Sequence, residues 1–398
     1  MKKIFLILLI IISSFRLVYL SIIPFGALPD EKFHFQRIQN IADSKSISPE
    51  FPNNEYYQPP LYYVLGSLIY RFFGRSYLTL RVFSFLMSFL YLILLQKVIS
   101  NLSLSKSVSI ALFISIALIP TFNIESIAIN NDILLYLLLM SFYFVFLRVY
   151  RKLHNFRYIL LISIISGGAI LTKQVGVIVI PSFIIFALKN KIPLKIVVLN
   201  TCLSLLVGLL WFYYDWKLYG NPVITYSLFR YSIIGSMDPF SFPLYIKSII
   251  VESAETYISA VGEFNNIRIG ALFYLSIYLL IFIALLGLIR GKIKNFLNVK
   301  NIVFFHLVFI FNLIIFIFLN FHYAFQPQGR YLYPSQIYIS LLLVIGFTNL
   351  FSGKKSILLP FFIFLILVFG NFWSLNCITS VYYKISYLPS IFACKIIQ

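Results

Sequence analysis

Long apolar runs limit what this chain can fold into. Eleven of them are long enough, or nearly so, to cross a bilayer: residues 4–23, 78–98, 107–121, 132–147, 158–172, 174–188, 196–214, 270–289, 301–320, 331–350 and 356–373. With 61% hydrophobic and 11% charged residues, the chain has more apolar surface than a soluble core buries. The sequence therefore predicts an all-α polytopic membrane protein with about 11 transmembrane helices.

Basic and acidic residues separate into different loops, and this separation predicts the topology. With the N-terminus placed in the cytoplasm, the inner loops hold 17 of the 32 basic residues and none of the 12 acidic residues. Loops rich in Lys and Arg stay on the cytoplasmic side. The net charge of +20 thus needs no nucleic-acid partner. We expect a multi-pass protein of the cell membrane with a cytoplasmic N-terminus and its acidic residues at the outer face.

Two long outer loops are predicted, at about residues 24–77 and 215–269. No internal repeat or flexible linker divides the chain, so residues 1–398 are expected to form one membrane domain without a separate soluble domain. Residues 61–73 are too short to span and are expected to lie in the outer interface. There Tyr62, Tyr63 and Tyr70 would sit among the lipid headgroups, with Arg71 and Arg75 reaching toward phosphates.

The first outer loop holds the candidate active site. It contains five of the 12 acidic residues, a polar density that is costly beside a bilayer unless it performs chemistry. In the stretch PDEKFHFQRIQNIADSKS, Pro29 is expected to open an interfacial helix. One side would be apolar and the other polar: Phe35, Ile38, Ile41 and Ala42 against Asp30, His34 and Arg37. Asp30 is predicted as a general base, or alternatively Asp30 and Glu31 only complement the positive helix end while His34 pairs with a neighbour.

Other candidate residues follow along the chain. Glu55 and Gln58 precede a rigid Pro-Pro pair, where the alternative is a turn with an incidental acid. Asp132 either caps a helix or joins Asp30 and Glu55 around one divalent cation. Lys173 lies between two apolar runs, where it is costly without an anionic partner unless it snorkels to the helix end.

Arg330 begins a span at the outer face and has the planar fork that suits phosphate oxygens. Its alternative role is an interfacial anchor beside Tyr331 and Tyr333. Among the three cysteines, Cys202 lies inside an apolar run, whereas Cys377 and Cys394 can form a disulfide if both face an oxidising side.

Several of these stretches resemble the GT-C class of membrane glycosyltransferases, which use polyprenyl-phosphate sugars. PDEKFHF resembles the Asp-Glu pair with a following His of protein O-mannosyltransferases, and EYYQPPLYY resembles a segment of the bacterial aminoarabinose transferases. LTKQVG resembles the Thr-Lys after their fifth span, and WKLYGNP and QGRYLYP resemble stretches of related uncharacterised proteins. The likeness runs in order from about residue 24 to residue 334.

The resemblance implies a GT-C-like fold and a role for each matching residue. Asp30 would be the catalytic base, and Glu31 and His34 would contact the acceptor or a cation. Glu55 and Asp132 would hold a divalent metal or contact the donor, with no metal at all as the alternative. Lys173 and Arg330 would bind the donor phosphate, and Gln58 and Tyr331 would position the substrate. Gln58 departs from the lysine that the bacterial enzymes often have there.

The predicted function is inverting transfer of a sugar from a polyprenyl-phosphate donor to a glycan, lipid or protein acceptor at the outer membrane face. A lipid phosphate is already a good leaving group, so a base and a positively charged cradle are more useful than a general acid. A multi-span transporter or lipid flippase is the main alternative, and an assembly protein is a third.

Overall fold

A computed structural model describes residues 2–44, 58–153, 155–219, 242–262, 266–291, 300–322, 326–351, 358–388 and 394–396. Within these ranges, eight helical segments are long and apolar enough to cross a membrane. They are α1 (Lys2–Ile22), α4 (Tyr77–Ser100), α7 (Asp132–Val149), α10 (Leu194–Tyr219), α12 (Ala271–Arg290), α14 (Lys300–His322), α15 (Gln336–Leu350) with the preceding 3₁₀ turn η6 (Gly329–Ser335), and α16 (Leu358–Tyr383). The predicted all-α membrane class is confirmed.

The three remaining predicted spans coincide with shorter helices. These are α5 (Lys106–Ala117), α8 (Phe156–Thr172), and α9 (Val179–Lys189), which follows the 3₁₀ turn η2 (Gln174–Ile178). A further turn, η1 (Tyr150–Lys152), links α7 to α8. Because these helices are short, the predicted number of eleven spans is not confirmed.

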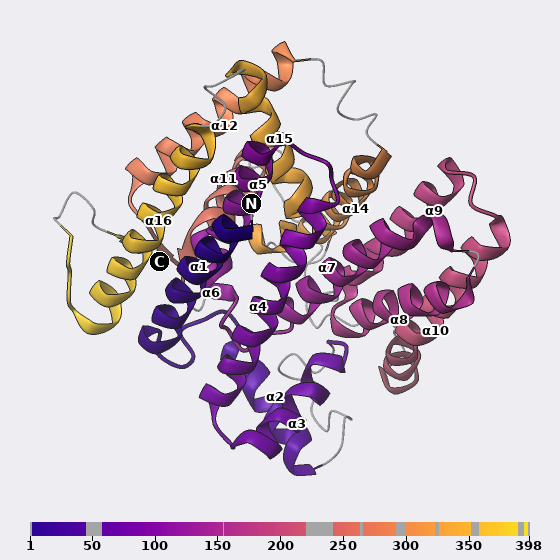
Figure 1. Ribbon diagram of the computed structural model, residues 1–398. Coiled ribbons are helices and arrows are strands. Elements are labelled where there is room, and N and C mark those ends of the chain that lie inside the picture. The colour runs from indigo at the N-terminus through magenta and orange to yellow at the C-terminus, as the bar shows by residue number, and fades with distance from the viewer. Residues whose placement is uncertain are drawn as a thin grey trace.

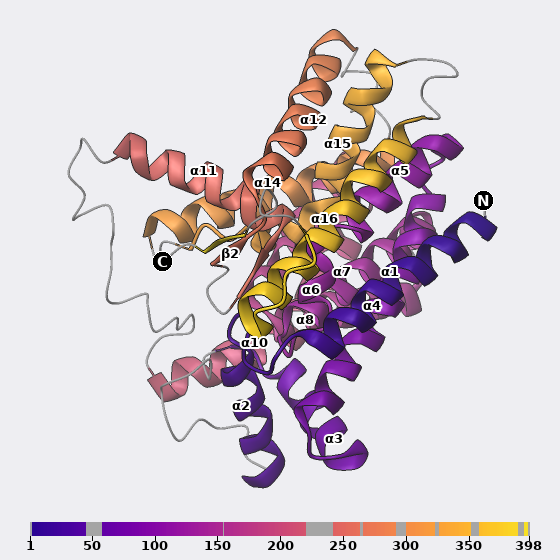
Figure 2. The same ribbon diagram turned by 90° about the vertical axis from the view of Figure 1, so that its left-hand side faces the viewer.

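Two helices of the first outer loop, α2 (Glu31–Ser44) and α3 (Leu61–Phe73), pack together at one end of the molecule. Figures 1 and 2 show them below the bundle, opposite the end at which α12 finishes. The predicted residue Glu55 lies between them, outside the described residues.

The structure corrects both the predicted start of α2 and its predicted polar face. The helix begins at Glu31 rather than at Pro29, because Asp30 has a φ of 59° in the left-handed region. Asp tolerates this conformation because its short side chain bonds locally. His34 and Arg37 lie on the same buried side as Ile38, not on an opposite polar face. The buried side of α2 therefore carries both charged and apolar groups.

The expected headgroup contacts of α3 were also wrong. Tyr62, Tyr63 and Tyr70 are buried against the protein instead. Arg71 donates to the carbonyl of Ala42 at 2.6 Å, because the last carbonyls of a helix have no intrahelical partner. Its neighbour Arg75 pairs with Asp43 at 3.0 Å. These contacts fix α3 to the C-terminal end of α2.

The second outer loop contains α11 (Phe242–Ile258) and two short strands, β1 (Ala260–Val261) and β2 (Ile267–Arg268). The chain end adds β3 (Lys395–Ile396), which pairs antiparallel with β2. A disulfide joins Cys377 of α16 to Cys394 beside β3. The backbone N–H of Ala260 donates to Thr121 in the short helix α6 (Pro120–Glu125) at 2.8 Å. The tail, the second outer loop and α6 are therefore linked at one end of the bundle.

Small residues allow close helix packing in the membrane-spanning part. A Cβ atom on Gly287 of α12 would lie 1.8 Å from the carbonyl oxygen of Gly346 in α15. A Cβ atom on Gly208 of α10 would lie 2.8 Å from the Ile170 side chain of α8. Such contacts stabilise helix pairs in lipid, where there is no hydrophobic driving force between helices. They fix the helices whose ends carry the polar residues described next.

Candidate functional site

Five charged side chains from separate segments meet beside the start of α2. We call them the charged cluster: Asp30, Glu125, Asp132, Lys173 and Arg330. Asp30 precedes α2, Glu125 ends α6, Asp132 begins α7, Lys173 follows α8, and Arg330 lies in η6. Of the residues predicted for the outer-face site, Asp30, Asp132, Lys173 and Arg330 are thus brought together, whereas Glu55 lies outside the described residues.

Two cations hold the three carboxylates of the cluster. The Arg330 guanidinium donates through Nη2 to Asp30 Oδ2 at 3.0 Å. Its Nη1 lies 3.6 Å from Glu125 Oε1. Lys173 Nζ donates to Asp132 Oδ1 at 2.6 Å. With all five groups ionised, three negative and two positive charges leave a net charge of −1.

Access to solvent differs within the cluster. The Asp30 side chain is 41% exposed and that of Lys173 is 18% exposed, whereas that of Arg330 is only 5% exposed. The Tyr331 ring lies near both cations, with its centroid 5.2 Å from Lys173 Nζ and 5.4 Å from Arg330 Cζ. A substrate can therefore reach Asp30 most directly, with Lys173 and Tyr331 beside it.

The backbone around Asp30 orients its carboxylate. The Asp30 carbonyl accepts the N–H of His34 at 3.0 Å and so begins the hydrogen bonding of α2. Just before it, Gly26 has a φ of 77°, a conformation that favours glycine because a Cβ atom is strained there. The turn of residues 24–30 thus brings the chain from α1 into α2 with Asp30 at the corner.

Burial and charge set the protonation of the groups outside the spans. Burial alone would raise the pKa of Asp30, but the Arg330 guanidinium beside it helps to hold that pKa below its usual range. Burial raises the pKa of Glu125 to about 7, although Arg330 opposes this. Burial would lower the pKa of Lys173, but the Asp132 carboxylate outweighs it and raises that pKa. At neutral pH Asp30 is ionised, Lys173 is charged, and Glu125 is near its midpoint.

His34 lies next to the cluster as a neutral imidazole. Burial lowers the pKa of His34 to about 4. Its Nδ1 and the Tyr63 hydroxyl share a hydrogen bond of 2.8 Å. At neutral pH His34 can therefore accept or donate a hydrogen bond but does not supply positive charge.

Glu31 faces the packed interior rather than the cluster. Its carboxylate accepts two hydrogen bonds from Arg81 of α4, each 2.7 Å long, and one from the Gly26 backbone N–H at 2.9 Å. Arg81 also donates to the carbonyl of Ile23 at 2.6 Å. This fully buried pair fixes the turn that precedes α2. The geometry fits a structural tie better than the predicted acceptor contact.

Gln58 lies beside the segment that leads into Asp132. The Asn131 side chain donates to the Gln58 side chain and, at 3.0 Å, to the carbonyl of Thr172. Thr172 directly precedes Lys173. Gln58 therefore lies near both Asp132 and Lys173.

The described carboxylates do not fit a metal site. Within the described ranges, no group of three or more His, Cys, Asp or Glu side chains is placed to hold a metal ion. Asp30 and Asp132 are each already within 3.0 Å of a cationic side chain. Of the two residues predicted to bind a metal, Glu55 and Asp132, only Asp132 lies within the described residues.

Sequence reasoning missed the role of Glu125 as a second partner of Arg330. The Asn130 side chain donates to Glu125 at 2.8 Å and accepts the Asp132 backbone N–H at 3.1 Å. Asn130 therefore joins two carboxylates of the cluster. A carboxylate in so apolar a stretch needs a cationic partner, and that cost could have singled out Glu125.

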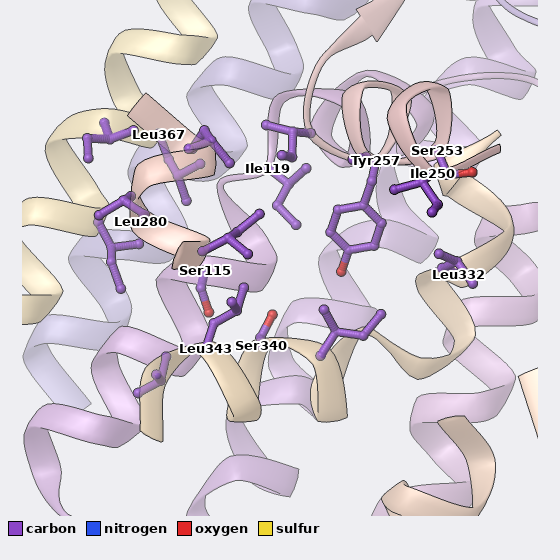
Figure 3. A pocket seen from close by; sticks show the side chains of 18 of the residues that line it. Ser115, Ile119, Ile250, Ser253, Tyr257, Leu280, Leu332, Ser340, Leu343 and Leu367 are labelled. Carbon is purple, nitrogen blue, oxygen red and sulfur yellow. The ribbon is translucent and has the colours of Figure 1, made fainter. Parts of the chain in front are cut away.

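A large apolar cavity lies on the other side of the segment that carries Arg330. It encloses about 440 Å³ between α5, α11, α12, α14, α15 and α16. Figure 3 shows the Tyr257 ring on its wall, with Leu332 and Ser340 nearby. The α11 backbone at Tyr257 touches Gly329, the residue before Arg330. The Tyr257 hydroxyl is buried without a hydrogen-bond partner.

Comparison with known proteins agrees with this architecture. Residues 57–214, which are 158 of the 398 residues, match the family of dolichyl-phosphate-mannose-protein mannosyltransferases. No curated protein sequence matches the chain significantly.

Solved structures share the fold over almost the whole chain. One is ArnT from Cupriavidus metallidurans bound to undecaprenyl phosphate, with a TM-score of 0.58 and 14% identity over 97% of this chain and 66% of that chain. Another is the Archaeoglobus fulgidus oligosaccharyltransferase without ligand, with a TM-score of 0.53 and 14% identity over 94% of this chain and 56% of that chain. The chain thus spans only part of the length of either protein. The predicted resemblance to the GT-C class is confirmed at the level of the fold.

The buried pair of Glu31 and Arg81 predicts a large loss of stability on substitution. Glu31→Ala leaves the Arg81 guanidinium buried without a counter-charge, so we expect the free energy of unfolding to fall by about 3–5 kcal/mol. Asp43→Ala is the control, because its pair with Arg75 has side chains 59% and 63% exposed. That change should cost less than about 1 kcal/mol. Denaturation of the detergent-purified variants measures both, and equal losses would contradict the assignment.

Proposed function

We propose that this chain, which has the fold of the GT-C membrane glycosyltransferases, is an inverting glycosyltransferase. Its donor would be a sugar on a polyprenyl phosphate, and its acceptor a hydroxyl or similar nucleophile of a glycan, lipid or protein. The observation that carries the proposal is Asp30, a partly exposed carboxylate whose Oδ2 lies 3.0 Å from Arg330 within a cluster that also contains Lys173.

In this mechanism Asp30 removes the proton of the acceptor. The acceptor oxygen forms a bond to the anomeric carbon as the bond from that carbon to the phosphate oxygen breaks. The proton moves to the Asp30 carboxylate, and the phosphate leaves with the bonding electron pair. A single displacement of this kind inverts the anomeric configuration. Positioned bases contribute typically about 10²–10⁴-fold to such rates.

The donor phosphate would exchange partners with the carboxylates. Lys173 and Arg330 stabilise the negative charge that develops on the leaving phosphate. As they turn toward the phosphate, Asp30 loses part of its positive neighbourhood. Because that neighbourhood holds its pKa low, Asp30 becomes a stronger base when the donor is bound.

The charge of the cluster supports an anionic ligand when Glu125 is protonated. Protonation changes the net charge from −1 to 0, since two carboxylates then face two cations. It also weakens the competition between Glu125 and a phosphate for Arg330. Glu125 therefore acts as a regulator of donor binding rather than as a base.

The apolar cavity supports a lipid-linked donor. Four membrane-spanning helices, α12, α14, α15 and α16, contribute to its wall together with α5 and α11. The backbone of α11 at this wall also contacts Gly329. A phosphate at Arg330 would thus have an apolar space one segment away for the isoprenoid chain.

The disulfide supports an active site on the outer face. Disulfides persist in oxidising compartments and are rare in the cytosol. The Tyr383 hydroxyl at the end of α16 donates to the carbonyl of Ile22 at 2.7 Å, close to the turn that carries Asp30. Cys377 lies less than two helical turns from Tyr383, so the disulfide belongs to the same end of the bundle as Asp30. We place the N-terminus, at the other end of α1, in the cytoplasm.

Asp30→Asn tests the assignment of the base. The amide keeps the shape of the side chain but cannot take a proton, so kcat should fall about 10²–10⁴-fold. Asp43→Asn, an exposed position on the same helix, should leave kcat unchanged. Transfer from a defined polyprenyl-phosphate sugar by purified protein measures both, and an undiminished kcat in Asp30→Asn would remove the base from the mechanism.

Glu125 predicts a dependence of donor affinity on pH. Below its pKa of about 7 the carboxyl is neutral and Arg330 is available to the donor phosphate, whereas above that pH the carboxylate competes. The KM for the donor should therefore rise as the pH increases through 7. Glu125→Gln keeps a neutral side chain at every pH, so its KM should stay flat across the same interval. Identical KM profiles for the two proteins would contradict this role.

A further inference from the structure

One buried carboxylate has no role in the proposed mechanism. Asp215, near the C-terminal end of α10, is fully buried, and neither of its oxygens has a hydrogen-bond partner. A buried group without a hydrogen-bond partner destabilises the fold, and a charged group does so more than a neutral one. Unsatisfied buried groups often mark a place where a ligand binds.

Arg37 provides a complementary charge from another helix. Its guanidinium is fully buried on α2 and interacts electrostatically with Asp215. The two groups do not hydrogen-bond to each other, since both Asp215 oxygens lack a partner. A guanidinium of α2 and a carboxylate of α10 therefore lie on the same buried region, and the carboxylate oxygens are not hydrogen-bonded.

Two aromatic rings complete the surroundings. The Arg37 Cζ lies 3.8 Å from the centroid of the Tyr63 ring and 5.8 Å from that of the Trp211 ring. Trp211 is one helical turn before Asp215 on α10 and lies beside its carboxylate. Apolar ring faces and two opposite charges are thus gathered between α2, α3 and α10.

This region continues from the proposed catalytic base. Asp30 directly precedes α2, and His34 and Arg37 follow on the buried side of that helix, so that the three residues extend over about 10 Å. Tyr63 contacts both His34 and Arg37: its hydroxyl hydrogen-bonds to His34, and its ring lies against the Arg37 guanidinium. A ligand that spans this distance would have one end at Asp30 and the other at Asp215.

The chemistry fits a neutral ligand with many hydroxyl groups. The Asp215 carboxylate accepts hydrogen bonds from hydroxyls, and the Arg37 guanidinium donates to hydroxyl oxygens. Aromatic faces pack against the C–H surface of a sugar ring. The opposite charges of Asp215 and Arg37 sum to zero, so the region favours no net charge on its ligand. We infer that Asp215, Arg37, Trp211 and Tyr63 form a subsite for a sugar ring of the donor or of the acceptor, an inference that rests on the proposed function.

Kinetics with matched variants test the subsite. Asp215→Ala removes the carboxylate that accepts hydrogen bonds, and Trp211→Ala removes one aromatic ring. Each change should raise the KM for one substrate about tenfold, roughly the loss of one charged hydrogen bond, with a smaller change in kcat. Trp216→Ala is the control, because Trp216 is on the same helix but 55% exposed. A raised KM for the donor assigns the subsite to the donor sugar, and a raised KM for the acceptor assigns it to the acceptor.

A binding measurement separates this inference from the proposed function. Trp211 is one of three tryptophans, so fluorescence of purified protein can be titrated with a panel of neutral methyl glycosides. We expect a saturable change that Trp211→Phe removes and Asp215→Ala weakens about tenfold. Unaltered KM values in both alanine variants would overturn the subsite, whereas a wild-type protein without transfer activity would overturn only the function. If that inactive protein also showed no fluorescence change, the subsite would be overturned as well.

Discussion

The pairing of Arg330 with Asp30 connects residues 300 positions apart and determines how the polar end of the molecule is built. Charges next to a bilayer are expensive unless they pair, so each segment that carries one must reach its partner. Arg330 draws the turn before α2 and the end of α6 toward η6, and Lys173 draws the start of α7 toward the end of α8. The charged residues therefore lie at or next to the ends of the helices, where the ion pairs form.

The site combines groups with different degrees of freedom. Glu31 and Arg81 form a rigid, fully buried pair that sets the turn of the chain. Asp30 is adjacent to that pair but much more exposed, so a substrate can reach it without disturbing the tie. A fixed backbone with an accessible carboxylate keeps a catalytic group in place and lowers the reorganisation that reaction requires.

The sequence predicted the membrane class because apolar runs and loop charges are local signals. It also selected Asp30, Asp132, Lys173 and Arg330, since each is a costly charge beside an apolar segment. It did not predict which cation pairs with which carboxylate, because those pairs join segments far apart in the chain. The faces of α2 and α3 were misjudged for the same reason. His34 and Tyr63 are polar enough for an interface, but they pack on each other inside the protein. The apolar cavity depends on six helices and leaves no local pattern.

The account depends on a carrier phosphate binding where Lys173 and Arg330 meet Asp30. Equilibrium binding of a polyprenyl phosphate without sugar tests this most directly. Lys173→Gln should weaken binding by roughly tenfold or more, the loss of one charge-assisted hydrogen bond. The double variant Asp132→Asn/Lys173→Gln avoids a buried unpaired carboxylate and should weaken binding similarly. Lys195→Gln, at an exposed position in the first turn of α10, is the control and should have no effect. If the Lys173 variants bind the carrier as tightly as the wild type, the charged cluster is not the phosphate site.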